Sequence, residues 1–76
     1  MNSEPKFDNM TEVYINCITE EEFEVMEDYH TNGEKVIIGY PRYNPEYNQY
    51  VYLISGCGSI LESACSLTPV NPMGFT

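Results

Sequence analysis

The sequence predicts a single small α+β domain of 76 residues, with its elements in the order β-α-β-β-α. Three observations support this prediction: alternating apolar and polar residues at 12–18, a capped amphipathic run at 19–30, and strand-like runs at 35–40 and 49–54. We therefore expect a three-stranded sheet covered on one face by an acidic amphipathic helix. A chain of this length buries only about 60% of its unfolded surface, so it can build one thin core.

The first strand and the first helix are predicted from adjoining segments. The stretch EVYINCI alternates apolar and polar residues, which is typical of a half-buried strand. Thr19 and Glu22 then have the spacing of a capping box, in which a hydroxyl and a carboxylate each bond an unpaired backbone N–H. We expect a helix from about 20 to 30, stopped by Asn32-Gly33.

A rotation of 100° per residue divides this helix into two sides. The apolar side holds Phe23, Val25, Met26, Tyr29 and His30. The other side holds the carboxylates of Glu20, Glu21, Glu24, Glu27 and Asp28. Glu22 is the exception, and its predicted role in the capping box accounts for its position.

The remainder of the chain predicts a hairpin and a second helix. An eight-residue loop at 41–48 joins the two later strands, and their direction relative to the first strand is left open. Tyr50 and Tyr52 alternate with Val51 and Leu53, so the tyrosines face solvent if the aliphatic side chains face the helix.

The sequence also predicts a second helix and an extended tail at each end of the chain. Ser59 and Glu62 repeat the capping-box spacing, which predicts a short helix at 60–66. Residues 1–10 and 67–76 are expected to be extended tails of the one domain, and Val70 or Phe75 could hold the second of them against the core.

Charge and cysteine content restrict the classes of function. Twelve acidic residues against three basic ones give a net charge of −9, which repels nucleic acids and anionic membranes and attracts basic surfaces. No run is apolar enough to span a membrane, and the first residues do not resemble a signal peptide. Three cysteines without an export signal indicate free thiols, so we expect a cytoplasmic protein.

The sequence contains no clear catalytic or metal-binding motif. Residues 28–33 imitate the start of a calcium loop, but its twelfth position is Gly39 instead of glutamate, and no C-x-x-C spacing suggests zinc. Cys57 and His30 could form a nucleophile and a base, but acidic surroundings disfavour a thiolate. We expect Cys57 to be buried and unreactive, and His30 to contact the last carbonyls of the helix. No enzyme activity, catalytic residue, metal or cofactor is expected.

Two features remain as candidates for binding a partner. The helix acids are unmixed with basic residues, although like charges at i and i+4 destabilise a helix. Tyrosines, which are frequent at interface hot spots, gather around Arg42 in the run 40–52. The predicted partner-binding residues are Glu20, Glu21, Glu24, Glu27, Asp28, Arg42, Tyr43, Tyr47 and Tyr50.

The spacing of the acids matches a nucleic-acid backbone. Carboxylates at i and i+4 stand about 6 Å apart along a helix, and duplex DNA carries one charge per ~3.4 Å on each strand. In length, charge, lack of catalytic motifs and αβ layout, the chain resembles the small acidic inhibitors that phages and mobile elements make against host enzymes. These include anti-restriction proteins, anti-CRISPR proteins and inhibitors of uracil-DNA glycosylase.

This resemblance implies a non-enzymatic inhibitor that occupies the basic nucleic-acid-binding surface of a host protein, in the host cytoplasm if a phage encodes it. Two alternatives from other classes stay open. One is a structural or assembly module that forms a homodimer or subunit contact through the tyrosine-rich hairpin. The other is a small enzyme or a thiol-dependent regulator.

Overall fold

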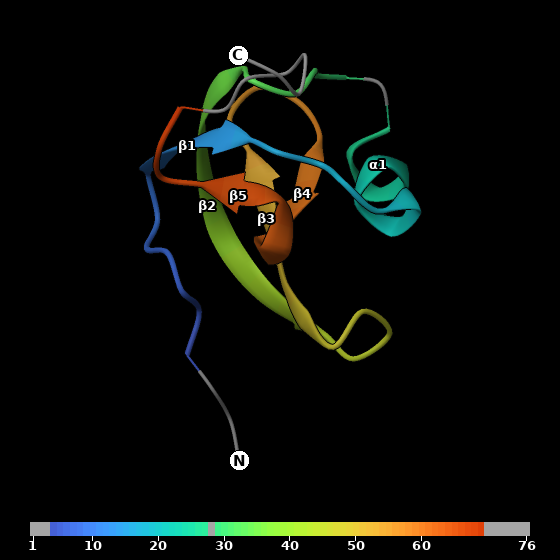
Figure 1. Ribbon diagram of the computed structural model, residues 1–76. Helices are drawn as coiled ribbons and strands as arrows, with labels where there is room; N and C mark the ends of the chain where they lie inside the picture. The colour runs from blue at the N-terminus through green and yellow to red at the C-terminus, as the bar shows by residue number, and fades with distance from the viewer. Residues whose placement is uncertain (1–3, 28, 70–76) are drawn as a thin grey trace.

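The computed structural model describes residues 4–27 and 29–69, and their strands form one antiparallel sheet in the order β4-β3-β2-β1-β5 (Figure 1). The elements in these ranges are β1 (Thr11–Ile15), α1 (Glu20–Met26), β2 (Lys35–Asn44), β3 (Gln49–Ile54), β4 (Ser59–Leu61), the 3-10 helix η1 (Glu62–Ala64) and β5 (Cys65–Ser66). The α+β class is confirmed, but the sheet has five strands where we predicted three. The first strand pairs antiparallel with β2, which the sequence left open.

The hairpin β2–β3 is longer than predicted, and its loop is shorter. Its turn covers only residues 45–48, and Asn48 closes the turn in a left-handed conformation with φ 58°. Between the pairs Gly39–Leu53 and Arg42–Val51 the register shifts by one residue, which marks a β-bulge. A bulge increases local twist and bends a strand, and β2 is visibly curved along its length (Figure 1).

The core lies on the inner side of this curved sheet. Alternate residues of each strand point inward, because successive side chains of a strand face opposite sides. The core cluster consists of Phe7, Val13, Ile15, Cys17, Met26, Val36, Ile38, Tyr52, Ile54, Ile60 and Ala64. Strands β1, β2, β3 and β4 each contribute buried residues to this cluster, so a single core joins these four strands.

The face of β3 that points inward is opposite to our prediction. Tyr52 is fully buried, whereas Leu53 is 49% exposed. The buried ring of Tyr52 packs edge-on against Phe7 at 5.8 Å between centroids, and its hydroxyl donates to Glu62 and accepts from the Phe7 N–H. Because the hydroxyl has these partners, burying it leaves no unsatisfied polar group.

Helix α1 is shorter than predicted and lies beside the β4 edge of the sheet, at the right in Figure 1. It ends at Met26, because Glu27 takes up a left-handed conformation with φ 58° and donates its N–H to the Phe23 carbonyl. Asn32-Gly33 therefore does not stop the helix, as we had expected. Met26 is buried in the core, while Phe23, predicted on the apolar side, is 48% exposed.

The prediction of a second helix at 60–66 is wrong. Ile60 and Leu61 pair with Tyr52 and Val51 of β3, and only a single 3-10 turn follows before β5. Glu62 does not complete a capping box with Ser59, because its carboxylate accepts from the Tyr52 hydroxyl and the Lys6 N–H.

The segment expected to be the first tail contributes to the core. Phe7 is only 6% exposed, and the backbone before β1 is tied to the sheet by bonds such as that from the Tyr40 N–H to Asn9. At the other end Leu67, Thr68 and Pro69 are exposed. The predicted contacts of Val70 and Phe75 lie outside the described residues.

Candidate functional site

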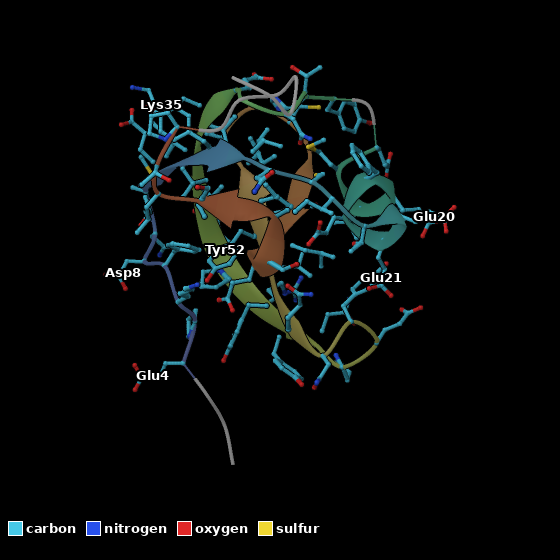
Figure 2. All side chains as sticks on the ribbon, viewed as in Figure 1. Glu4, Asp8, Glu20, Glu21, Lys35 and Tyr52 are labelled. Atoms are coloured by element: carbon cyan, nitrogen blue, oxygen red, sulfur yellow. The ribbon has the colours of Figure 1, made fainter. Side chains whose placement is uncertain are left out.

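The acidic residues of α1 point away from the core. Glu20, Glu21, Glu24 and Glu27 are all exposed, and Figure 2 shows Glu20 and Glu21 directed outward from the helix. Asp28, the fifth predicted member of this set, lies outside the described residues. The expectation of a solvent-facing group of carboxylates therefore holds for the four glutamates that the structure describes.

Glu22 has the different role that its spacing predicted. Its N–H donates to the Thr19 hydroxyl at 3.2 Å, and its carboxylate accepts from the Thr19 N–H at 2.9 Å, which completes the capping box. The carboxylate also accepts from the Ile18 N–H at 2.6 Å and from the Ser63 hydroxyl. The Ser63 bond joins α1 to η1, so Glu22 fixes both the start of the helix and its position on the sheet.

The protonation of Glu22 follows from these contacts. Burial alone raises the pKa of Glu22, but the hydrogen bonds from Ser63, Ile18 and Thr19 outweigh it, so the pKa is lowered. The side chain is 5% exposed and stays ionised at neutral pH. It is thus a structural carboxylate and does not belong to the exposed set.

The hairpin turn extends the acidic surface of α1. Partial burial and the negative charges of Glu46, Glu24 and Glu21 raise the pKa of Tyr47, so carboxylates of the helix and of the turn both act electrostatically on its hydroxyl. We call the exposed residues Glu20, Glu21, Glu24, Glu27 and Glu46 the acidic face. The fold brings Tyr47, a predicted contact residue, to the border of this face.

The acidic face lacks compensating charge within residues 4–27 and 29–69. The ion pairs in those ranges are His30–Glu34 at 3.0 Å and Lys35–Glu12 at 3.9 Å, and neither involves a residue of the acidic face. Figure 2 places Lys35 on the side of the molecule away from Glu20 and Glu21. The negative charge is therefore open to an external cation.

The other predicted contact residues are not brought together with the acids. Tyr43 and Tyr50 are cross-strand partners with ring centroids 5.5 Å apart, and the Tyr43 hydroxyl donates to Asn48. Tyr50 packs partly against the core. Arg42 pairs with Val51, so it extends from the opposite face of the hairpin to that of Tyr43.

A second polar cluster joins residues that sequence reasoning treated separately. His30 lies beyond the end of α1, with Nδ1 at 3.0 Å from Glu34 and Nε2 at 2.8 Å from the Cys57 carbonyl oxygen. The expected contact of His30 with the helix carbonyls is therefore wrong. Burial alone lowers the pKa of His30, but the bonds to Glu34 and to the Cys57 carbonyl outweigh it and raise the pKa.

The expectation that Cys57 is buried is also wrong, since this thiol is exposed. Its backbone carbonyl, and not its sulfur, contacts His30, so the imidazole is not placed to activate the thiol. Burial raises the pKa of Cys17 to about 11 and that of Cys65 to about 12, which keeps both thiols protonated. No group of three or more His, Cys, Asp or Glu residues in the described part of the chain could hold a metal ion.

Among the described residues, no helix is long and apolar enough to cross a membrane. Comparisons with protein-family models, with curated proteins and with solved structures gave no match to this chain.

Proposed function

We propose that this chain is a small non-enzymatic inhibitor that binds the basic, nucleic-acid-binding surface of another protein through its acidic face. The observation that supports the proposal is the exposure of Glu20, Glu21, Glu24 and Glu27 without an ion pair among the described residues. Two of them, Glu21 and Glu24, act electrostatically on Tyr47 of the hairpin turn, as does Glu46. Such a surface offers charge from the helix and an aromatic contact from the hairpin.

The α1 glutamates can replace a short run of phosphates. Glu20 and Glu24 are four residues apart and so occupy one side of the helix, and Glu27 follows as the exposed C-cap residue. Successive carboxylates stand about 6 Å apart along the axis, which is comparable to every second phosphate of a duplex strand. The lysine and arginine side chains that receive a DNA or RNA backbone could pair with them.

Charge of one sign also determines how such a complex forms. A chain with net charge −9 is steered toward a positive groove, and this attraction weakens as salt screens it. The same field repels nucleic acid, so the protein and the nucleic acid compete for one partner surface. An anti-defence role in a phage or mobile element, of the anti-CRISPR or anti-restriction type, belongs to this proposal.

The test is capture of partners on the immobilised protein from a nuclease-treated bacterial lysate. Bound proteins are eluted with duplex DNA or with a salt gradient and identified by mass spectrometry. We expect basic nucleic-acid-binding proteins that duplex DNA displaces, and we expect the double variant Glu20→Lys/Glu24→Lys to lose them. A loss of at least about tenfold is expected, because two attractive charges become repulsive.

A matched control reverses the same number of charges elsewhere. Glu4 and Asp8 are exposed and lie on the side of the molecule away from α1 (Figure 2). The variant Glu4→Lys/Asp8→Lys changes the net charge equally and should keep the captured proteins. Equal retention by both variants, or capture that duplex DNA does not disturb, would refute the proposal.

A further inference from the structure

A second surface, on the outer side of β2 and β3, is apolar in a chain that is otherwise strongly charged. Met10 is 76% exposed, Tyr40 72%, Leu53 49% and Ile37 36%. These side chains line two adjoining hollows that share Tyr40 and Leu53. We call Met10, Ile37, Tyr40, Val51 and Leu53 the outer apolar face. Single exposed apolar residues are ordinary, but a contiguous group of them marks a site of interaction.

Tyr40 projects from the middle of this face because of the bulge in β2. Its φ of 51° lies in the left-handed region, which is unfavourable for a bulky side chain. A bond of 2.6 Å from its N–H to Asn9 holds this conformation, and the pairs on either side of the bulge keep the strand in the sheet. The fold thus maintains an unfavourable backbone conformation at a residue whose ring is left in solvent.

The hollow beside Tyr40 is of a size to receive an aromatic ring. Its volume is about 230 Å³, and it has no charged residue in its lining, which includes Met10, Ile37 and Leu53. Gly39 also lines the hollow, and a Cβ there would lie 3.2 Å from Asn9 Oδ1. A projecting ring and an apolar hollow therefore lie next to each other on one surface.

The two ends of the outer apolar face carry opposite charges. The Arg42 side chain is exposed at one end, and its guanidinium makes no hydrogen bond or ion pair with residues 4–27 or 29–69. Glu12 is exposed at the other end, where it pairs across the strands with Ile37. Its distance to Lys35 is 3.9 Å, the limit of an ion pair, so Glu12 can accept a better partner.

We propose that the outer apolar face binds a second copy of this chain about a two-fold axis that passes near Leu53. Such an axis places Tyr40 of each copy against the hollow of the other and Arg42 of each copy opposite Glu12 of the other. A surface that carries a projection beside a hollow, and a cation and an anion at its two ends, is complementary to itself under this rotation. Tyr40 and Arg42 belong to the tyrosine-rich hairpin through which a homodimer was the predicted alternative, but Tyr50 and Tyr52 take no part, because they point to the inner side of the sheet.

This dimer does not depend on the proposed inhibitor function, because α1 lies beside β4 and not on the outer apolar face. The two processes also respond oppositely to salt. Screening weakens the attraction of the acidic face for a basic partner. Between two copies it weakens the exposed Arg42–Glu12 pairs, which contribute little, but it relieves the larger repulsion between two chains of charge −9. Dimerisation should therefore strengthen as salt is added.

The test is sedimentation of the purified full chain over a wide range of concentration, at low and at high salt. We expect a reversible change from the monomer mass to twice that mass, at lower protein concentration when salt is high. Leu53→Glu should weaken the dimer by more than about tenfold, since it places a charge in the apolar contact. The matched control is Leu67→Glu, because Leu67 is also exposed, at 65%, but follows β5.

A charge exchange tests the two-fold arrangement itself. Arg42→Glu and Glu12→Arg should each weaken the dimer, and the double variant should restore it, because each copy again places opposite charges together. Circular dichroism of each variant confirms that the chain stays folded. A monomer at every concentration and salt, equal effects of the Leu53 and Leu67 variants, or a double variant weaker than both single variants would overturn the proposal.

Discussion

The segments that begin at Thr19 and at Ser59 carry the same local signal and fold differently. Each has a hydroxyl residue followed three positions later by glutamate, and each continues with apolar residues. After Thr19 the chain forms α1, whereas Ser59 begins β4. The comparison separates what a capping box can determine from what it cannot.

The two segments differ in which donors bond the glutamate carboxylate. Glu22 accepts from the Thr19 N–H, three residues away, so the local bond and the tertiary bond from Ser63 favour the same structure. Glu62 accepts instead from the Tyr52 hydroxyl at 2.7 Å and from the Lys6 N–H at 2.8 Å. Distant donors replace the local ones, so a capping signal starts a helix only where no stronger partner takes its carboxylate.

Backbone pairing between β4 and β3 also disfavours a helix after Ser59. Ile60 and Leu61 are fully buried and pair with β3, which a helix at 60–66 would prevent. Met26 of α1 reaches the core from a helix at the sheet edge, where no strand pairing competes. The weak helix preference of a short segment is thus overridden where the segment can extend a sheet.

Removal of the Glu22 carboxylate should have the largest effect. We expect Glu22→Ala to lower the free energy of unfolding by about 2–4 kcal/mol, because it removes a buried side chain and leaves the partly buried donors of Ile18, Thr19 and Ser63 without their acceptor. Urea unfolding followed by circular dichroism measures the change. The control, Glu21→Ala, removes an exposed carboxylate of the same helix and should change it by less than about 0.5 kcal/mol.

The hydroxyls of the two capping signals give the most direct test of the comparison. Thr19→Ala removes an acceptor for the Glu22 N–H and should cost about 1 kcal/mol. The Ser59 side chain makes no hydrogen bond with the described residues, so Ser59→Ala should stay within about 0.5 kcal/mol. Equal costs in urea unfolding would mean that the cap at Thr19 does not stabilise α1.

The smallest effect is expected at His30, as a dependence of stability on pH. Both ring nitrogens face acceptors, and the folded pKa is raised above the ordinary value. The stabilisation is therefore complete below the unfolded pKa of about 6.5 and is lost as pH rises through the folded pKa. It should amount to less than about 1 kcal/mol, since Glu34 is exposed to solvent.

The measurement for His30 compares the protein with His30→Gln by urea unfolding at about pH 5.5 and about pH 8. The difference in stability between the two proteins should shrink at the higher pH. An NMR titration of the imidazole gives its folded pKa directly. A difference that grows with pH, or a folded pKa below the ordinary value, would contradict the geometry.

The features of the candidate site that depend only on residues close together in the sequence could be predicted. The exposure of Glu20, Glu21 and Glu24 follows from helical periodicity, and the role of Glu22 follows from its distance to Thr19. The approach of Tyr47 to Glu21 and Glu24 could not be predicted, because it depends on how the hairpin lies against α1. The contact of His30 with Cys57 joins residues 27 positions apart and has no local signal.

The sequence by itself determined the net charge, the start of α1, the exposed α1 glutamates and the strand character of 35–40 and 49–54. The physical reason is that charge is a sum over residues, while caps and periodicities act within three or four positions. Only the tertiary structure decided that Tyr52 is buried and Leu53 exposed, that 59–61 pairs with β3, and that β2 bends beside Tyr40. These outcomes depend on partners far along the chain, such as Phe7 and Tyr52, 45 residues apart, whose contact no local pattern encodes.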